Sequence, residues 1–196
     1  KILLFGCSGF IGKELIPRLI KEKHDICIVS RRNIDQLQLG DFLNKISFLK
    51  LDITKEKNWL NVNLIKNLQD NDGIINLIGE PIADKRWTLN QKREIESSRI
   101  NTTKYLMNKL KSLNINPKFI INASAIGYYG TSLNNEFTED SKSGEDFLAK
   151  LCENWEKEAL KKPFFTRLVI FRIGIVLGKD GGALGKMLPI FKIGLG

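Results

Sequence analysis

Gly6-Cys7-Ser8-Gly9-Phe10-Ile11-Gly12 lies between the apolar run Lys1–Phe5 and an amphipathic segment. This order predicts a strand, a tight turn and the start of a helix, by which α/β proteins bind a dinucleotide pyrophosphate. Gly6 allows the sharp turn, Gly9 lacks the Cβ that would block the phosphate, and Gly12 lets helix and strand approach. Every residue of the stretch except Cys7 is a candidate cofactor contact. The first spacing is G-x-x-G instead of the common G-x-G, and glycines also mark plain turns.

The bulk composition is that of a globular protein. The chain has 196 residues, of which 42% are hydrophobic and 27% charged, and this suggests one domain, or one domain and part of another. No apolar run approaches the ~18 residues of a membrane-spanning helix, and the start reads as a core strand instead of a secretory signal. The cysteines Cys7, Cys27 and Cys152 are odd in number and form no C-x-x-C pair, so neither a metal site nor a disulfide framework is predicted. We expect a cytoplasmic protein without a membrane partner.

The net charge of +9 raises the question of a nucleic-acid partner. The lysines are dispersed and interleaved with acids, as in Lys55-Glu56-Lys57 and Glu156-Lys157-Glu158. No basic stripe with interleaved aromatic residues appears. We therefore expect no nucleic-acid partner, and we assign the charge to solubility and to a local attraction for an anionic cofactor.

Strand and helix patterns alternate along the chain, which predicts an α/β fold with a doubly wound, mainly parallel sheet. The expected strands are Lys1–Phe5, Asp25–Ser30, Ile46–Leu51, Gly73–Ile78, Phe119–Ala123 and Arg167–Arg172. The expected helices are Phe10–Lys23, Trp59–Leu68, Leu89–Leu113 and Ser143–Lys161. Thr88-Leu89-Asn90-Gln91 has the form of a capping box. The glycine-rich stretch Gly178–Gly196 predicts no terminal helix, and we interpret the chain as a fragment of a longer protein.

The residues that follow the second expected strand indicate which dinucleotide fits. An NAD site places Asp or Glu there, where it accepts hydrogen bonds from the ribose. This chain has Ser30-Arg31-Arg32 instead. Arg31 and Arg32 can bind a 2′-phosphate through charge-assisted contacts, so NADP(H) is predicted, although a solvated basic turn has the same sequence. Asp52, after the third strand, is a candidate neighbour of the adenine or a plain turn cap.

Ligands of doubly wound sheets bind beyond the carboxyl ends of the strands. Three segments of this chain lie there: Asn76–Pro81, Asn122–Ala125 and Arg172–Val176. Small residues such as Gly79 permit close approach of a cofactor, or tight packing of strand and loop. The Ser124 hydroxyl could bind a substrate carbonyl near the nicotinamide, although a structural role is the plainer interpretation.

Several motifs together make the chain resemble the extended short-chain dehydrogenase/reductases, which include the sugar-nucleotide epimerases. The glycine turn, Ser124 and Tyr129-Gly130 carry the wider resemblance. A narrower set resembles the atypical branch named "epimerase family protein", some of whose members carry a cell-division inhibitor label. That set is Glu80-Pro81-Ile82-Ala83-Asp84-Lys85-Arg86-Trp87, Ser98-Arg99-Ile100, Gly127-Tyr128-Tyr129-Gly130, Phe137-Thr138-Glu139-Asp140 and Gly181-Gly182-Ala183-Leu184.

The resemblance implies an NADP(H)-binding Rossmann domain over residues 1–172. Residues 173–196 would then begin a smaller substrate domain, most of which is missing here. The cofactor contacts that the resemblance implies are Ser30, Arg31, Leu77, Ile78, Glu94, Arg99 and Val176. Without it, Glu94 and Arg99 read as a solvated charge pair on a helix.

The chain departs from the wider group at the expected catalytic helix. Ordinary members use Tyr-x-x-x-Lys, in which the tyrosine is the general acid/base and the lysine lowers its pKa. Aligning Phe147–Glu156 on its closing glutamate puts Leu148 at the tyrosine position and Cys152 at the lysine position. Leucine has no proton to give, and a buried cysteine is mostly neutral. Tyr128 and Tyr129 are candidate substitutes, although a Tyr-Tyr-Gly turn more often packs.

We therefore expect an NADP(H)-dependent oxidoreductase or epimerase-like enzyme acting on an unidentified small molecule, with Ser124 polarising a carbonyl. The alternative is an NADP(H)-binding regulatory protein with little turnover, linked to cell division. The long helices could pair across a homodimer or simply cover the sheet.

Overall fold

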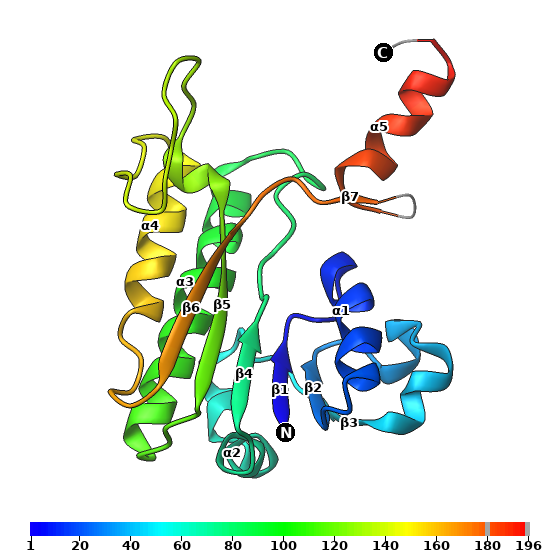
Figure 1. The fold of residues 1–196 in the computed structure, drawn as a ribbon, viewed down its shortest axis with the longest axis vertical. Helices are drawn as coiled ribbons and strands as arrows, with labels where there is room; N and C mark the ends of the chain where they lie inside the picture. Colours follow the sequence, from blue (N-terminus) through cyan, green and yellow to red (C-terminus); the bar gives the residue numbers. More distant parts are fainter. Residues whose placement is uncertain (179–180, 195–196) are drawn as a thin grey trace.

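A six-stranded parallel sheet forms the centre of the computed structural model, which describes residues 1–178 and 181–194. The strands lie in the order β3-β2-β1-β4-β5-β6, as in doubly wound Rossmann-like folds (Figure 1). Their bounds are β1 Ile2–Phe5, β2 Ile26–Ser30, β3 Ile46–Lys50, β4 Gly73–Asn76, β5 Phe119–Ala125 and β6 Arg167–Ile173. The fold class predicted from the sequence is confirmed.

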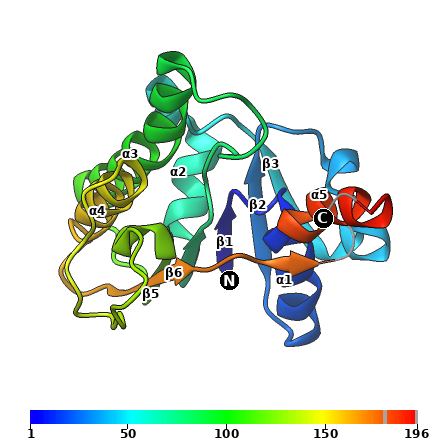
Figure 2. The same ribbon diagram turned by 90° about the horizontal axis from the view of Figure 1, so that it is seen from above.

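Helices cover the sheet on both faces (Figure 2). The helix α1 (Phe10–Lys21) lies on one face, and α2 (Val62–Gln69), α3 (Leu89–Ser112) and α4 (Phe147–Ala159) lie on the other. Beyond β6, the short strand β7 (Leu177–Gly178) leads to α5 (Gly182–Lys192), which stands above the carboxyl ends of the strands in Figure 1.

Each face of the sheet has its own apolar core. On one face, Leu4 and Ile28 pack with Ile16 of α1, and all three are fully buried. On the other face, Phe5 packs with Leu64 of α2 and Leu106 of α3. Because β1 and β2 contribute to both cores, all their residues are buried, as is typical of the central strands of a parallel sheet.

The sequence misplaced several element boundaries, and local hydrogen bonds explain two of the shifts. α4 begins at Phe147 instead of Ser143, because the Asp146 side chain accepts a hydrogen bond from the Ala149 N–H at 2.8 Å and caps the helix there. Trp59 lies in a 3₁₀ segment, and α2 begins at Val62 after Asn61, whose side chain accepts from the Leu64 N–H at 3.0 Å.

Other expectations have mixed outcomes. The Thr88 cap is confirmed, since its hydroxyl accepts a hydrogen bond from the Gln91 N–H at 3.2 Å. β4 ends at Asn76, before the predicted Ile78, and β5 continues to Ala125. The prediction of no terminal helix was wrong, because α5 occupies Gly182–Lys192, while the last two residues lie outside the described part. The domain boundary at residue 172 stays a prediction.

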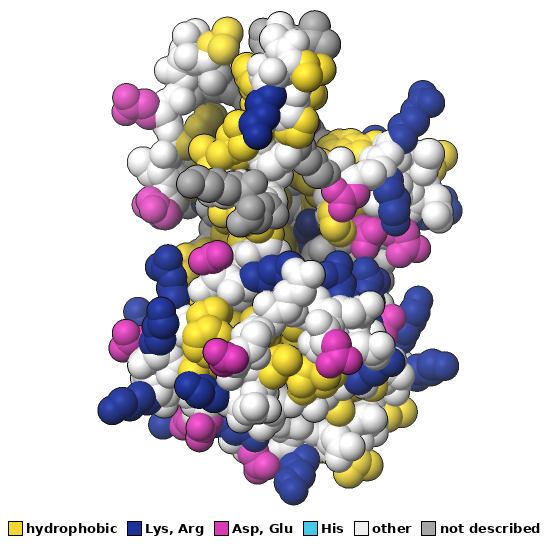
Figure 3. Space-filling model, turned by 90° about the vertical axis from the view of Figure 1, so that its right-hand side faces the viewer, with side chains coloured by type: hydrophobic (Ala, Val, Ile, Leu, Met, Phe, Trp, Pro, Cys, Tyr) yellow, Lys and Arg dark blue, Asp and Glu magenta, His cyan; other side chains and the backbone are white. Residues whose placement is uncertain are grey.

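The surface carries charges of both signs. Figure 3 shows Lys and Arg side chains spread among acidic and apolar ones on one face of the molecule. Within the described residues, no helix has both the length and the apolar character needed to span a bilayer.

Candidate functional site

The glycine turn links β1 to α1 by close backbone packing. Gly6 has a φ of 73°, and a Cβ built on it would lie 2.5 Å from the backbone nitrogen of Ile78. A Cβ on Gly12 would lie 2.0 Å from the carbonyl oxygen of Cys7. A Cβ on Gly9 would meet nothing closer than 3.8 Å, so the surface beside Gly9, at the N-terminus of α1, is open. The turn therefore has the open helix N-terminus that an anionic group requires.

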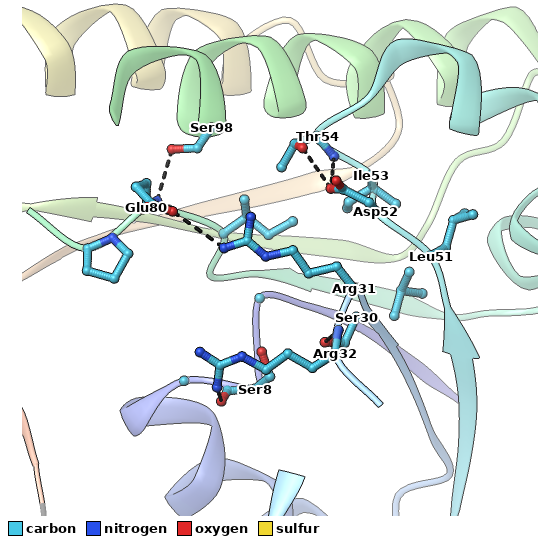
Figure 4. Close-up of a pocket in the computed structure, with 16 residues that line it drawn as sticks. Ser8, Ser30, Arg31, Arg32, Leu51, Asp52, Ile53, Thr54, Glu80 and Ser98 are labelled. Carbon is cyan, nitrogen blue, oxygen red and sulfur yellow. Dashed lines mark hydrogen bonds and ion pairs between the residues drawn. The ribbon is translucent and has the colours of Figure 1, made fainter. Parts of the chain in front are cut away.

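A cavity of about 160 Å³ adjoins this turn at the carboxyl ends of β1, β2 and β4 (Figure 4). It brings together many of the residues predicted to bind the cofactor: Gly6, Ser8, Gly9, Ser30, Arg31, Arg32, Asp52, Ile78 and Gly79. The segments that supply them are far apart in the sequence, and the strand order of the sheet places them side by side.

Two arginines form the cationic wall of the cavity. Arg32 is fixed at both ends, because its backbone N–H donates to Ser30 Oγ at 3.1 Å and its guanidinium donates to the Ser8 carbonyl at 3.2 Å. The Arg31 side chain is 61% exposed and reaches across the cavity (Figure 4). A guanidinium so placed can bind an anion that replaces the Glu80 carboxylate, which lies 3.4 Å away.

Asp52 acts as a turn cap as well as lining the cavity. Its Oδ1 accepts hydrogen bonds from the Thr54 N–H at 3.1 Å and the Thr54 hydroxyl at 2.7 Å. The sequence allowed two roles for Asp52, a neighbour of the adenine or a turn cap. The structure shows the turn cap.

Glu80 is a charged cavity residue that the sequence analysis did not assign to the cofactor site. Its carboxylate lies between Arg31 Nη2, at 3.4 Å, and Lys85 Nζ, at 3.0 Å. The hydrogen bond from Lys85 is the main reason that the pKa of Glu80 lies below its usual range, and partial burial opposes the shift. The available signal was its position directly after the small residue Gly79 at a strand end.

Other predicted contacts lie outside this cavity. Phe10, Ile11 and Val176 line a separate open groove between α1 and the chain after β6. Leu77 packs against the core on the α1 side, and Glu94 is exposed on α3. These residues are not brought to the cavity.

Arg99 supports the cavity from behind instead of lining it. Its Nη1 donates to the carbonyl oxygens of Glu80, at 3.0 Å, and Ile95, at 3.1 Å. Its guanidinium lies 5.5 Å from the ring centre of Trp155, whose indole N–H donates to Thr103 Oγ1 at 2.9 Å. Burial lowers the pKa of Arg99 from its usual value. The side chain therefore ties the segment after β4 to α3 and α4.

The candidate catalytic residues form a second polar group at the carboxyl ends of β5 and β6. The Ser124 hydroxyl donates to Glu156 Oε1 at 2.5 Å. Arg172 binds both oxygens of the same carboxylate, through Nε at 3.0 Å and Nη2 at 2.9 Å. Arg172 Nη1 also donates to the Tyr129 hydroxyl at 3.0 Å, and the guanidinium lies 3.6 Å from the ring centre of Tyr128. Glu156 is the main cause that raises the pKa of Arg172.

The chemical capacities of the two groups differ. Ser124, Glu156 and Arg172 satisfy one another, and the tyrosine rings pack around the guanidinium. Cys152, on α4 next to Ser124, is buried, and burial raises the pKa of its thiol, so it stays neutral at pH 7. The first cavity, by contrast, can take up an anion.

Comparisons with known proteins place the chain. The model of the NAD dependent epimerase/dehydratase family matches residues 2–192. The chloroplastic epimerase family protein SDR39U1 homologue of Arabidopsis thaliana is 38% identical over 190 residues, covering 96% of this chain and 52% of the relative. The human epimerase family protein SDR39U1 is 33% identical over 199 residues, covering 100% of this chain and 61% of the relative.

Solved structures agree. The crystal structure of human epimerase family protein SDR39U1 (isoform 2) with NADPH matches with a TM-score of 0.79 and 32% identity, covering 100% of this chain and 60% of that one. A nucleoside-diphosphate sugar epimerase from Corynebacterium glutamicum matches with a TM-score of 0.73 and 25% identity, covering 97% and 37%. The chain thus spans little more than half the length of the curated relatives described above. With a family model that covers nearly all of its residues, the chain belongs to the NAD dependent epimerase/dehydratase family, and it is similar to the members named epimerase family protein.

Proposed function

We propose that the chain binds NADP(H) at the carboxyl edge of its sheet and forms the cofactor-binding part of an oxidoreductase or epimerase-like enzyme of the atypical extended short-chain group. The observation that carries this proposal is Arg31, an accessible cation at the end of β2, where an NAD site has an acid. The human relative whose structure contains NADPH supports the choice of cofactor.

The residues that would hold the cofactor are those of the cavity. The backbone beside Gly9, at the N-terminus of α1, would face the pyrophosphate, because unpaired N–H groups and the helix dipole favour negative charge there. Arg31 would bind the 2′-phosphate, and Arg32 would hold the turn through its hydrogen bond to Ser8. When bound, NADP(H) supplies a hydride donor or acceptor.

The Ser124 hydroxyl donates its hydrogen bond to Glu156 Oε1 in this structure, so it is not directed at a substrate. To polarise a substrate carbonyl, the Ser124 hydroxyl would have to exchange that partner for the substrate. The Tyr129 hydroxyl accepts a hydrogen bond from Arg172 Nη1 at 3.0 Å, and this contact leaves its own proton free to be donated. Ser124, Tyr128 and Tyr129 thus stay catalytic candidates.

A second candidate function is an NADP(H)-binding regulatory protein with little or no turnover. The closed network of Ser124, Glu156 and Arg172 favours it, as do Leu148 and Cys152 at the positions of the usual Tyr and Lys. Steady NADPH consumption with carbonyl substrates would separate the two functions, since only the enzyme turns over. A cytoplasmic location, a small-molecule substrate and a homodimer stay predictions, and the Arabidopsis relative is named chloroplastic.

Parallel titrations of NADPH and NADH, followed by nicotinamide fluorescence, test the cofactor assignment. We expect a clear preference for NADPH and a loss of about tenfold or more in NADPH affinity for Arg31→Ala, because one charge-assisted contact is removed. Arg93→Ala, on the exposed surface of α3, is the charge-matched control and should leave affinity within twofold. Equal binding of both nucleotides, or no binding, would refute the proposal.

A further inference from the structure

One carboxylate and two cations meet at the mouth of the cavity. Glu80 Oε2 lies 3.4 Å from Arg31 Nη2, and Oε1 lies 3.0 Å from Lys85 Nζ. The Glu80 side chain is only 17% exposed, whereas those of Arg31 and Lys85 are 61% and 63% exposed. Figure 4 shows the Arg31 side chain extended from the end of β2 toward Glu80 on the opposite wall.

The backbone holds Glu80 in this place. Its N–H donates to Ser98 Oγ at 2.9 Å, and its carbonyl oxygen accepts from Arg99 Nη1 at 3.0 Å. Pro81 follows and restricts the backbone further. Since α3 fixes the segment on both sides of the Glu80 Cα atom, the carboxylate cannot leave the cavity by a simple backbone shift.

The contact between Arg31 and Glu80 crosses the cavity from wall to wall. The volume of about 160 Å³ is smaller than the roughly 300–1,000 Å³ of typical ligand pockets. A dinucleotide would therefore need these walls to separate, and the Arg31–Glu80 pair is an interaction that must then break.

We propose that Glu80 competes with the 2′-phosphate of the nucleotide for Arg31 and so sets the affinity of the site for 2′-phosphorylated nucleotides. This inference rests on the proposed binding of NADP(H). A phosphate that reaches Arg31 displaces the carboxylate and then lies near it, and like charges at short range repel. Lys85 retains the displaced carboxylate and reduces the repulsion. Glu80 thus weakens NADPH binding while leaving NADH, which has no 2′-phosphate, almost unaffected.

The test measures NADPH and NADH affinities for Glu80→Gln, which keeps the shape of the side chain and removes its charge. We expect NADPH to bind about three- to fivefold more tightly and NADH to change less than twofold, since partly exposed charge pairs contribute up to about 1 kcal/mol, which is about fivefold in affinity. Unchanged NADH binding also reports that the variant is folded. In an Arg31→Ala background, Glu80→Gln should improve NADPH affinity by no more than twofold, because the cation for which Glu80 and the 2′-phosphate compete is absent.

Each outcome decides the matter. NADPH binding that is unchanged or weakened in Glu80→Gln, or NADH binding that rises equally, overturns the inference and leaves the proposed function intact. An equal gain in the Arg31→Ala background shows simple charge repulsion without competition, and also overturns it. No NADPH binding by either the native chain or Glu80→Gln overturns the proposed function and this inference together.

Discussion

Two polar regions at the carboxyl edge of the sheet use the same kinds of residue in opposite ways. In the cavity, Arg31 is 61% exposed and meets Glu80 through one contact of 3.4 Å. At the carboxyl end of β6, Arg172 is 18% exposed and holds Glu156, 9% exposed, through two contacts of 2.9 and 3.0 Å. The first pair has one long contact and a highly exposed cation, whereas the second has two short contacts and two largely buried members.

The difference separates a cation that is available to a ligand from one that is committed to the fold. An exposed ion pair contributes at most about 1 kcal/mol to stability, so a ligand anion can replace its carboxylate at a small loss of free energy. Removing one member of a buried ion pair lowers the free energy of unfolding several times more, because the remaining charge is buried without an opposite charge or water to compensate it. The same chemistry therefore indicates binding in one region and architecture in the other.

Arg172→Met should show the largest effect. We expect the free energy of unfolding to fall by about 3–5 kcal/mol, because Glu156 would be left buried without a cation, with the Ser124 hydroxyl as its remaining hydrogen-bond donor. Urea denaturation measures this loss. Arg167→Met, exposed at the start of β6, is the matched control and should change stability by less than about 0.5 kcal/mol. A loss below about 1 kcal/mol for Arg172→Met would show that the Arg172–Glu156 pair stabilises the fold no more than an exposed ion pair does, and would contradict the distinction between the two regions.

Gly12→Ala should come next, with a loss of about 3 kcal/mol, since the new Cβ would lie 2.0 Å from a backbone oxygen and the turn would have to shift. Thermal unfolding checks this expectation. Gly9→Ala is the contrast within the same turn, because its Cβ meets nothing closer than 3.8 Å. It should cost about 1 kcal/mol or less, as expected at a helix N-cap. Equal losses would mean that Gly9 also serves packing alone.

Alkaline pH should produce the smallest effect, through the neutral thiol beneath the charged cavity. Burial raises the pKa of Cys7 from 9.0 to about 12. The unfolded thiol loses its proton near pH 9 while the folded one keeps it, so this contribution is complete below pH 9 and declines as pH rises toward 12. The slope is at most about 1.4 kcal/mol per pH unit. Urea titrations of the native chain and Cys7→Ala at pH 8 and 10 measure it, and equal slopes would contradict the assignment.

The sequence predicted the sheet because its central strands are continuous apolar runs, and the alternation of strand and helix then determines the parallel topology. It failed where a local side-chain hydrogen bond decides the boundary, as at Asp146 and Asn61. The glycines after β6 led to the prediction that no helix follows, but α5 begins at one of them, Gly182.

The cavity was predictable to the extent that strand ends meet at one edge of the sheet. Arg31 could be placed there because it directly follows a strand. Glu80 could not be paired with Arg31, since no spacing rule relates residues from two loops whose distance depends on the whole fold. Arg99 was assigned to the cofactor by resemblance, and its place beneath Glu80 depends on how α3 packs on α4.

The stacking of Arg99 on Trp155 gives the protein an optical reporter. The indole of Trp155 is 4% exposed, so water does not quench its emission directly, and a cation over the ring shifts the electronic levels that set its colour. The same guanidinium donates to the carbonyls of Glu80 and of Ile95 on α3, so a displacement of the Glu80 loop that draws Arg99 with it changes the position of the charge relative to the ring. Trp59, buried against Phe5 and Tyr105, supplies a steady reference signal. Trp87 lies on the same loop as Glu80 and is 39% exposed, so the wavelength of Trp155 emission is read in a Trp87→Phe background.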